Sequence, residues 1–429
     1  MKKLISMIMY NLVQCFIINY HLALHSNTSS LYRKKEAFQL PLTFIEEIFK
    51  AGKVRTVMML RESRDREISN NPPDVKTGRK WRAEEATNEI ISSLEHRDIV
   101  GSVQNDRAGL GNGNFRPFKK MSHKDRRKAA TGQVRQIESG RREVHLVQCA
   151  QQGQVTGCEE HIIERKIGWS EVWNWTTSRL SFLMKSTYDV LPSPVNLVRW
   201  KVQEEDKCRC GRTGTMKHIL SNCQLALDRY TWRHNEVLKI FIKTAEERVE
   251  EGKYARKPRK SLQSKIQFVP EGGKIHVENQ KTTAVEFESN GQWKVSADLK
   301  GYHGFFPIPT AKKPDLVVWS EELHEVHLIE LTVPHEDNIR AAHGRKEERY
   351  EELVGECEEA GWKATLFSVE VGCRGFIAES TRKWMKLAAG LNTKQERIMM
   401  KDLQETVEKA SHWIWLKRDD SSWLENIDL

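Results

Sequence analysis

The sequence predicts a mixed α/β protein, with a helical N-terminal part and a C-terminal part in which strands and helices alternate. Three observations lead to this prediction. Apolar residues recur at helical spacing up to about residue 245. They alternate with the period of strands between residues 266 and 380. Between these parts, a group of cysteines at 208–223 predicts a small metal-stabilised knuckle.

These patterns divide the 429 residues into consecutive segments. We expect an apolar N-terminal segment (1–34), a basic, partly disordered helical linker region (35–165), a helical region with the knuckle (166–245), a charged linker (246–265), an α/β domain (266–380) and a helical tail (381–429).

The first segment begins with two lysines and an apolar run, which is the pattern of a signal peptide or a membrane anchor. Asn11, Gln14 and Asn19 interrupt the run, and no cleavage site of small residues follows. The interruptions favour a buried helix, or a segment unrelated to the rest, over membrane or secretory targeting.

Residues 40–65 predict a helix followed by a short apolar strand. The stretch from 69 to 142 is mostly polar and contains the basic run KDRRK and the turn-rich RAGLGNGNF. GLGNG admits a phosphate-binding loop, but no strand precedes it and no clear helix follows. A plain loop is therefore the favoured interpretation.

Residues 167–200 are rich in aromatic side chains and predict one helix that ends at Pro192 and Pro194. The tryptophans could stack on bases, but burial in the core is the better default. A second helix is expected over 224–244, where the apolar residues form a stripe.

Strand patterns begin after the charged linker. We expect strands at 265–272, 291–299, 313–319, 325–333 and 364–372, a helix near 338–360, and helices from Ser380 onward.

The chain is basic, with 69 Lys and Arg against 59 Asp and Glu, a formal charge of +10 and a pI near 9.1. This charge favours a polyanionic partner such as nucleic acid, although a generically basic protein would look the same. Its eight cysteines are too sparse for a disulfide-dense secreted domain, which excludes that class.

The knuckle CRCGRTGTMKHILSNC offers three thiols and one imidazole, from Cys208, Cys210, His218 and Cys223. This ligand set suits tetrahedral Zn²⁺ in a structural role, because four protein ligands leave no open position for water. The Cys-x-Cys opening is tighter than the usual spacing. The alternative is a set of unrelated thiols and a surface histidine.

Basic residues close to these motifs are candidate nucleic-acid contacts. Arg229, Arg233 and His234 lie in RYTWRHN after the knuckle, where they could follow phosphates or simply solvate the helix. Lys312 and Lys313 precede the strand at 313–319 and are counted with them.

The stretch AKKPDLVVWSEELHEVHLIELTVP places one acid at the start of a strand and another near the end of the next. If the strands are antiparallel around a turn at 322–323, Asp315 falls opposite Glu330, with Cβ atoms about 5 Å apart. Like charges there are destabilising, and Mg²⁺ bound by both carboxylates would remove that cost. The alternative is a slipped register that leaves both acids solvated.

The following helix adds a lysine to this pair. On a helical wheel, Lys346 and Tyr350 fall within the apolar stripe that faces the sheet. Lys346 either extends to the helix edge or points at the carboxylates, where an ammonium could stabilise charge at a phosphodiester. Two acids on adjacent strands and a lysine are the set used by PD-(D/E)xK nucleases. Thr332 stands where their short motif has the lysine, so Lys346 would supply it from the helix.

From about Leu40 to the C-terminus, the sequence resembles the region that follows the polymerase in non-LTR retrotransposons with a restriction-like endonuclease. The resemblance rests on blocks in the same order: VRTVMMLRESRD, TGRKWRAEEAT, RAGLGNG, RLSFLMKSTYDVLPSPVNLVRW, the knuckle with RYTWRHN, KPDLVVW, LIELTVPHED, RKEERYEEL, VEVGCRGF and HWIWLKR.

The resemblance implies a restriction-like core that nicks DNA to prime reverse transcription of the element's RNA. Asp315 and Glu330 look like its Mg²⁺-binding acids, Lys346 like its displaced lysine, and Tyr350 like an aromatic that the family keeps nearby. The knuckle would be its zinc site, which helps to grip nucleic acid. The implied partners are target DNA, element RNA and a polymerase-bearing chain, with a nuclear location and no small-molecule cofactor.

The sequence also departs from that family. It contains no Tyr-x-Asp-Asp polymerase motif, its knuckle opens with Cys-x-Cys, and its first thirty residues match nothing in the family, which suggests a truncated or fused reading frame. Two alternatives to an active nuclease follow. One is a catalytically inactive, zinc-stabilised nucleic-acid-binding remnant, and the other is an interaction protein with a structural zinc.

Overall fold

The computed structural model describes residues 38–41, 44–100, 117–148, 161–255, 292–300, 302, 310 and 312–420. The predictions for segment 1–34, for the GLGNG loop and for a strand at 265–272 lie outside these residues. The chain divides into two units, one formed by 1–156 with 164–174 and the other by 157–163 with 175–429.

The first unit is built from helices. Its elements are β1 (Phe38–Gln39), α2 (Ile45–Arg61), α3 (Arg66–Asn70), α4 (Ala83–Val100), η2 (Phe118–Lys120), α5 (His123–Val147), β2 (Arg165–Lys166) and α6 (Trp169–Asn174). The helices α2, α4 and α5 pack around one core, whose buried residues include Val54, Met58, Ile90 and Val134.

The strand predicted after the first helix is wrong, because VRTVMML continues α2. Val54, Val57 and Met58 are buried at helical spacing, and the packing against α4 and α5 overrides the local preference of β-branched residues for strands. In the polar stretch that follows, the described residues include the helices α4 and α5.

The periodicity of α5 is hidden because its inward face carries charges. Arg142 donates to Glu47 of α2 at 2.7 Å, and Lys50 of α2 donates to Glu138 at 3.0 Å. All four residues are less than a tenth exposed. The buried face of α5 combines a few apolar residues such as Val134 with ion-paired charges, which weakens the apolar stripe in its sequence.

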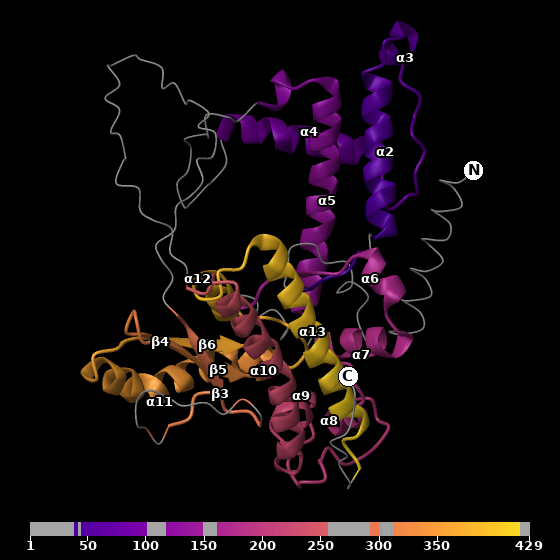
Figure 1. Cartoon of the computed structure of the whole chain (residues 1–429). Coiled ribbons are helices and arrows are strands. Elements are labelled where there is room, and N and C mark those ends of the chain that lie inside the picture. The colour runs from indigo at the N-terminus through magenta and orange to yellow at the C-terminus, as the bar shows by residue number, and fades with distance from the viewer. Residues whose placement is uncertain are drawn as a thin grey trace, which may run out of the picture. The chain divides into compact units, whose positions relative to one another are not determined.

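The second unit contains a four-stranded sheet and most of the remaining helices (Figure 1). Its elements are α7 (Thr177–Thr187), α8 (Pro194–Arg199), α9 (Met216–Ser221), η4 (Gln224–Ala226), α10 (Leu227–Glu250), β3 (Lys294–Ala297), β4 (Leu316–Ser320), β5 (Glu325–Thr332), η5 (Glu336–Asn338), α11 (Ile339–Glu359), β6 (Lys363–Glu370), α12 (Glu379–Leu387) and α13 (Thr393–Leu416). The predicted mixed α/β class is confirmed.

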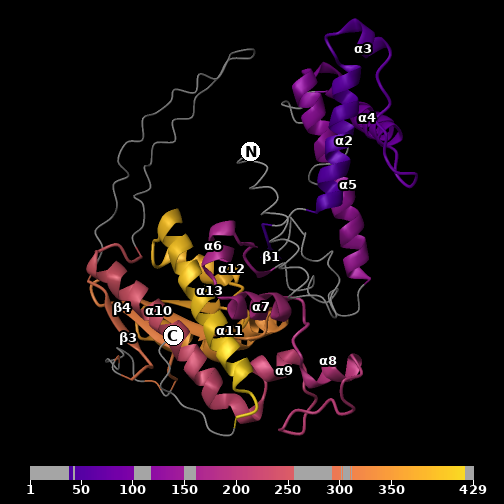
Figure 2. The same cartoon turned by 90° about the vertical axis from the view of Figure 1, so that its right-hand side faces the viewer.

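The strand order is β3-β4-β5-β6, antiparallel at the first two pairings and parallel between β5 and β6. Helix α11 is the crossover that a parallel pair requires. Alternate residues of the strands face opposite ways, so both faces of the sheet are apolar. Helix α11 covers one face, while α10, α12 and α13 cover the other (Figures 1 and 2).

Two further predictions need correction. Residues 167–200 form three helices rather than one, and Pro194 begins α8 at its first position instead of ending a helix. The tryptophans here are not core residues, since Trp173 is 62% exposed and Trp169, Trp175 and Trp200 are half-buried.

The charged linker predicted from residue 246 starts too early, because α10 continues to Glu250. Arg248 is buried and donates to the backbone carbonyls of Ala389 and Gly390, both at 2.8 Å. Among the described residues, no helix combines the length and the apolar character needed to cross a membrane.

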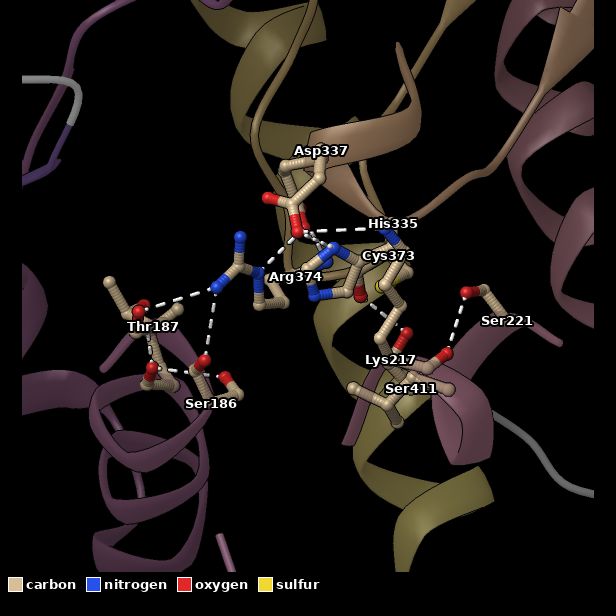
Figure 3. A network of polar contacts seen from close by, with 12 residues as sticks. Ser186, Thr187, Lys217, Ser221, His335, Asp337, Cys373, Arg374 and Ser411 are labelled. Carbon is tan, nitrogen blue, oxygen red and sulfur yellow. Dashed lines mark hydrogen bonds and ion pairs between the residues drawn. The ribbon is translucent and has the colours of Figure 1, made fainter. Parts of the chain in front are cut away.

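A buried polar network fixes the segment after β6, where the sequence reads VEVGCRGF (Figure 3). Arg374 is 2% exposed and pairs with Glu336 at 2.6 Å, and it also reaches the backbone carbonyls of Ser186 and Thr187 on α7 at 3.2 and 3.3 Å. A buried charge needs this degree of pairing. The network therefore joins the ends of β5 and β6 to α7.

Candidate functional site

The cysteine knuckle brings together the ligands that its spacing predicts. The ligand atoms of Cys208, Cys210, His218 and Cys223 lie within 4.8 Å of one another. The Cys210 Sγ is 3.1 Å from the His218 Nε2, and the Cys208 and Cys223 Sγ atoms are 3.8 Å apart. Three soft sulfurs and one imidazole can hold a metal ion such as zinc.

Short elements position these ligands. The turn after Cys208 is closed by a hydrogen bond of 2.8 Å from the Gly211 N–H to the Cys208 carbonyl. Gly211 has φ near +80°, a conformation that favours glycine. His218 lies in α9, where the Thr215 hydroxyl accepts its N–H at 3.0 Å as an N-cap. Cys223 directly precedes η4.

The pKa values of the cluster residues shift in different directions. Burial lowers the pKa of His218, which keeps its imidazole neutral. A backbone hydrogen bond from Arg212 lowers the pKa of Cys210, whereas burial raises the pKa of the Cys223 thiol to about 12. A metal ion would displace the remaining thiol protons on binding.

Helix α10 begins beside this cluster and is anchored to it by Tyr230. The Tyr230 hydroxyl accepts the Cys223 N–H at 3.1 Å and donates to the Ile219 carbonyl at 2.7 Å. The start of α10 is therefore fixed by the same residues that group the thiols and the imidazole.

The two arginines of RYTWRHN are structural, which corrects the expectation that they contact phosphates. Arg233 is 1% exposed and donates to two carbonyls and one hydroxyl at 2.9 to 3.2 Å. Arg229 is 6% exposed and donates to two carbonyls after α13, at 2.5 and 2.7 Å. Both guanidinium groups therefore bind the protein itself and do not face a phosphate.

The two acids of the strand pair lie together. Leu316 pairs with Ile329 in the antiparallel register, so Asp315 falls opposite Glu330. The Asp315 N–H donates to the Glu330 Oε2 at 3.2 Å, and the Leu331 N–H donates to the Asp315 Oδ2 at 2.8 Å. These bonds hold both carboxylates at one end of the β4–β5 pair.

Lys346 of α11 points at the carboxylates instead of extending to the helix edge. Its Nζ forms an ion pair with the Glu330 Oε1, and its side chain is 22% exposed. Burial raises the pKa of Glu330, the charge of Asp315 raises it further, and the ammonium of Lys346 opposes both. Glu330, Asp315 and Lys346 therefore form one group of interacting charges.

Tyr350 and the two lysines of the KPD segment lie beside this group. The Tyr350 hydroxyl donates to the Lys313 carbonyl at 3.0 Å, and burial together with Glu330 raises the pKa of Tyr350. Lys312 forms an ion pair with Glu352 of α11, whereas Lys313 is exposed. Lys313 is thus the more accessible of these two candidates for a phosphate.

His234 is a member of the site that the sequence analysis placed elsewhere. Its Nε2 lies 3.3 Å from the Asp315 Oδ2 and 3.2 Å from the Leu331 carbonyl oxygen. Burial alone would lower the pKa of His234, but the hydrogen bond and negative charge of Asp315 raise it. Its spacing from the buried Val237, Leu238 and Phe241 puts His234 on the sheet-facing side of α10, a signal that the sequence carried.

No family model and no curated protein matches the chain.

Proposed function

We propose that this protein is a metal-dependent endonuclease module that nicks DNA, and that its sheet with α11 is a restriction-like PD-(D/E)xK core. The main support is the convergence of Asp315, Glu330 and Lys346, which lie just before β4, in β5 and in α11, into one hydrogen-bonded group. A carboxyl whose pKa is raised by burial and by a second acid, beside a lysine, is typical of functional sites.

The donor set fits a hard divalent cation. The Asp315 and Glu330 carboxylates and the Leu331 carbonyl lie at the same end of the strands, and Mg²⁺ takes oxygen ligands of these kinds. When bound, Mg²⁺ supplies charge neutralisation at a phosphodiester and activation of water.

The chain's own side chains would complete the site. The Lys346 ammonium is positioned to stabilise negative charge that develops on a phosphate oxygen. Tyr350 holds the backbone at Lys313 and thereby fixes the start of the strand that carries Asp315. The exposed Lys313 and the net charge of +10 would attract the DNA backbone.

The Cys208, Cys210, His218 and Cys223 cluster would act as a zinc knuckle that holds α9 and α10 in place. Together with the resemblance described above, these features support the role of a non-LTR retrotransposon endonuclease. It would act in the nucleus, where its nick primes reverse transcription by a polymerase carried on a partner chain.

The test is nicking of supercoiled plasmid with Mg²⁺ by the full chain and its variants. We expect Asp315→Asn and Lys346→Met each to slow nicking by about 10²-fold or more. Asp402→Asn and Lys386→Met are matched controls on exposed helix positions and should nick like the wild type. Equal rates for wild type and Asp315→Asn would refute the endonuclease.

The metal-ligand cluster and the basic charge also support a second candidate, a zinc-stabilised nucleic-acid-binding protein without catalysis. It predicts that DNA is retained in a salt-dependent manner, because bound phosphates release counterions, and that no variant or wild type nicks the plasmid.

A further inference from the structure

We propose that Lys313, Arg345 and Arg349 form a phosphate-binding surface that holds the backbone of duplex DNA. This surface lies beside the carboxylates of Asp315 and Glu330. The proposal rests on the proposed function, because it says how the nuclease would hold its substrate. It assigns a binding role to two arginines of α11 to which that function gives none, and it names the side of α11 that faces the DNA.

Tyr350 brings the cations of this surface together. Its hydroxyl donates to the Lys313 carbonyl at 3.0 Å, and the Arg349 guanidinium lies over its ring, 5.6 Å from the ring centroid. Arg345 precedes Arg349 by four residues, so their side chains are neighbours on one side of α11. Asp315 follows Lys313 by two residues. The three cations therefore lie next to the carboxylates, on the side of α11 that meets the segment before β4.

The charges of these three side chains are available to an anion. Lys313, Arg345 and Arg349 are all exposed. Within the part of the chain that the structure describes, none of them forms an ion pair or donates a side-chain hydrogen bond. Glu352 lies three residues after Arg349 and could have paired with it, but it is bound by Lys312 instead. An anion from outside the chain would therefore meet no competing carboxylate partner on these cations.

The order of charges along α11 is unfavourable for the helix itself. Its four Lys and Arg residues all lie within 340–349, whereas its seven glutamates lie within 347–359. A helix is stabilised by the opposite order, with acids in its first turn and cations in its last. Arg345 and Arg349 also place like charges four residues apart, which destabilises a helix further. Local rules of this kind are typically broken at functional sites, so the arrangement indicates a ligand for the cations.

The phosphate backbone of DNA fits this surface. A guanidinium group binds phosphate oxygens through two parallel N–H donors, and a lysine binds them as a point charge. Such contacts position the duplex and carry no sequence information. The glutamates in the second half of α11 would repel the same backbone. The duplex would therefore cross the first half of α11 and Lys313, where Lys346 contacts Glu330.

The test is binding of a short DNA duplex to the full, zinc-loaded chain without Mg²⁺, measured by fluorescence anisotropy over a range of salt concentrations. The logarithm of the binding constant falls linearly with the logarithm of the salt concentration, and each phosphate contact contributes about 0.9 to the slope. Lys313→Gln, Arg345→Gln and Arg349→Gln should each lower the slope by about this amount. Each should weaken binding by about 5–10-fold at roughly 0.1 M salt. A duplex of unrelated sequence should give the same changes.

Arg340→Gln is the matched control. Arg340 is another exposed arginine of α11, but it lies about 140° and 180° around the helix axis from Arg345 and Arg349. This variant should keep the affinity and the salt slope of the wild type. Thermal unfolding separates binding from folding, because Arg345→Gln removes a contact between like charges and should be at least as stable as the wild type.

A wild type that does not bind duplex DNA, salt slopes that stay unchanged in all three variants, or an equal loss in Arg340→Gln would overturn the proposal. Variants that lose binding to an RNA duplex but keep binding to DNA would overturn it as well. The measurement does not depend on cleavage. If the variants lose DNA binding but the wild type never nicks, the phosphate-binding surface stands and the endonuclease fails. Nicking by a wild type whose variants bind DNA normally has the opposite meaning.

Discussion

The cysteine cluster and the carboxylate site are built in opposite ways. All four ligands of the cluster lie within residues 208–223, so one turn and one short helix assemble it. The carboxylate site collects side chains from α10, from the residue before β4, from β5 and from α11, between His234 and Lys346. The cluster therefore depends on local turns, whereas the carboxylate site depends on the register of strands and the packing of helices.

The largest expected effect comes from the cluster, because a bound metal contributes its binding free energy to folding. Cys223→Ser, or removal of zinc by a chelator, should destabilise the second unit by several kcal/mol. This is less than the roughly 10–16 kcal/mol that Zn²⁺ binding contributes to the folding of zinc-finger peptides. The measurements are zinc content and thermal unfolding. Cys357→Ala, at a buried thiol away from the cluster, should lose some stability but no zinc.

This substitution also tests whether the two sites are independent. Because α10 begins at the cluster and carries His234, which contacts Asp315, zinc-free protein should also nick DNA more slowly. Nicking at the wild-type rate without zinc would show that the sheet and α11 hold the carboxylate site unaided.

The next effect concerns the support of the carboxylate site. Arg374→Met leaves the Glu336 carboxylate buried without its cation, and breaking such a pair costs about 3–5 kcal/mol. Urea unfolding would measure this loss. Arg397→Met removes an exposed arginine of α13 and should change stability by less than about 0.5 kcal/mol. Similar values for both variants would mean that the network of Figure 3 contributes little.

Alanine substitutions at two glycines test backbone packing and helix propensity separately. A Cβ added at Gly372 would collide with the Glu336 carboxylate, so Gly372→Ala should cost about 1–3 kcal/mol. At Gly355 in α11 a Cβ meets nothing within 4 Å, so Gly355→Ala should stabilise by about 0.5–1 kcal/mol. Unfolding curves in which both variants shift the same way would contradict the packing of the segment after β6.

The last effect is a pH dependence at Asp337, whose side chain is 41% exposed, so that solvent screening reduces its contribution to stability. Burial opposes its ionised form, but the hydrogen bond and charge of His335, with Arg374 and Lys217, lower the pKa of Asp337 to about 2. An ordinary aspartate in the unfolded chain has a pKa near 3.9. The stabilisation is therefore complete above about pH 4 and declines toward pH 2.

Acid unfolding of the wild type and Asp337→Asn would measure this contribution. The variant should be less stable near neutral pH, and the gap should close as the pH falls toward 2. A gap that stays constant with pH would assign the difference to something other than ionisation.

The sequence predicted the parts of the molecule that follow from short-range spacing or from one turn. The ligands of the cluster are near each other in the chain, and Asp315 and Glu330 oppose each other because a single tight turn sets the register of β4 and β5. The helical stripe placed Lys346 on the inward face, where it contacts Glu330.

The errors arose where distant parts of the chain decide the outcome. The sequence at the end of α2 has the pattern of a strand, but packing against α4 and α5 makes it helical. The buried face of α5 includes ion-paired charges, which weaken its apolar stripe. The stretch RYTWRHN has the basic composition of a phosphate-binding motif, with Arg229, Arg233 and His234. Only the folded positions of β5 and α13 show that the arginines bind carbonyls and that the histidine reaches Asp315.

Helix α10 limits how this molecule can be divided. Its start is tied to the cysteine cluster, its middle packs on the sheet, and Arg248 near its end is bonded to the loop after α12. A recombinant fragment that starts at residue 266 would expose to water the part of the apolar sheet face that α10 covers. The smallest piece worth expressing for crystallisation or nuclease assays therefore begins before Cys208 and extends through α13.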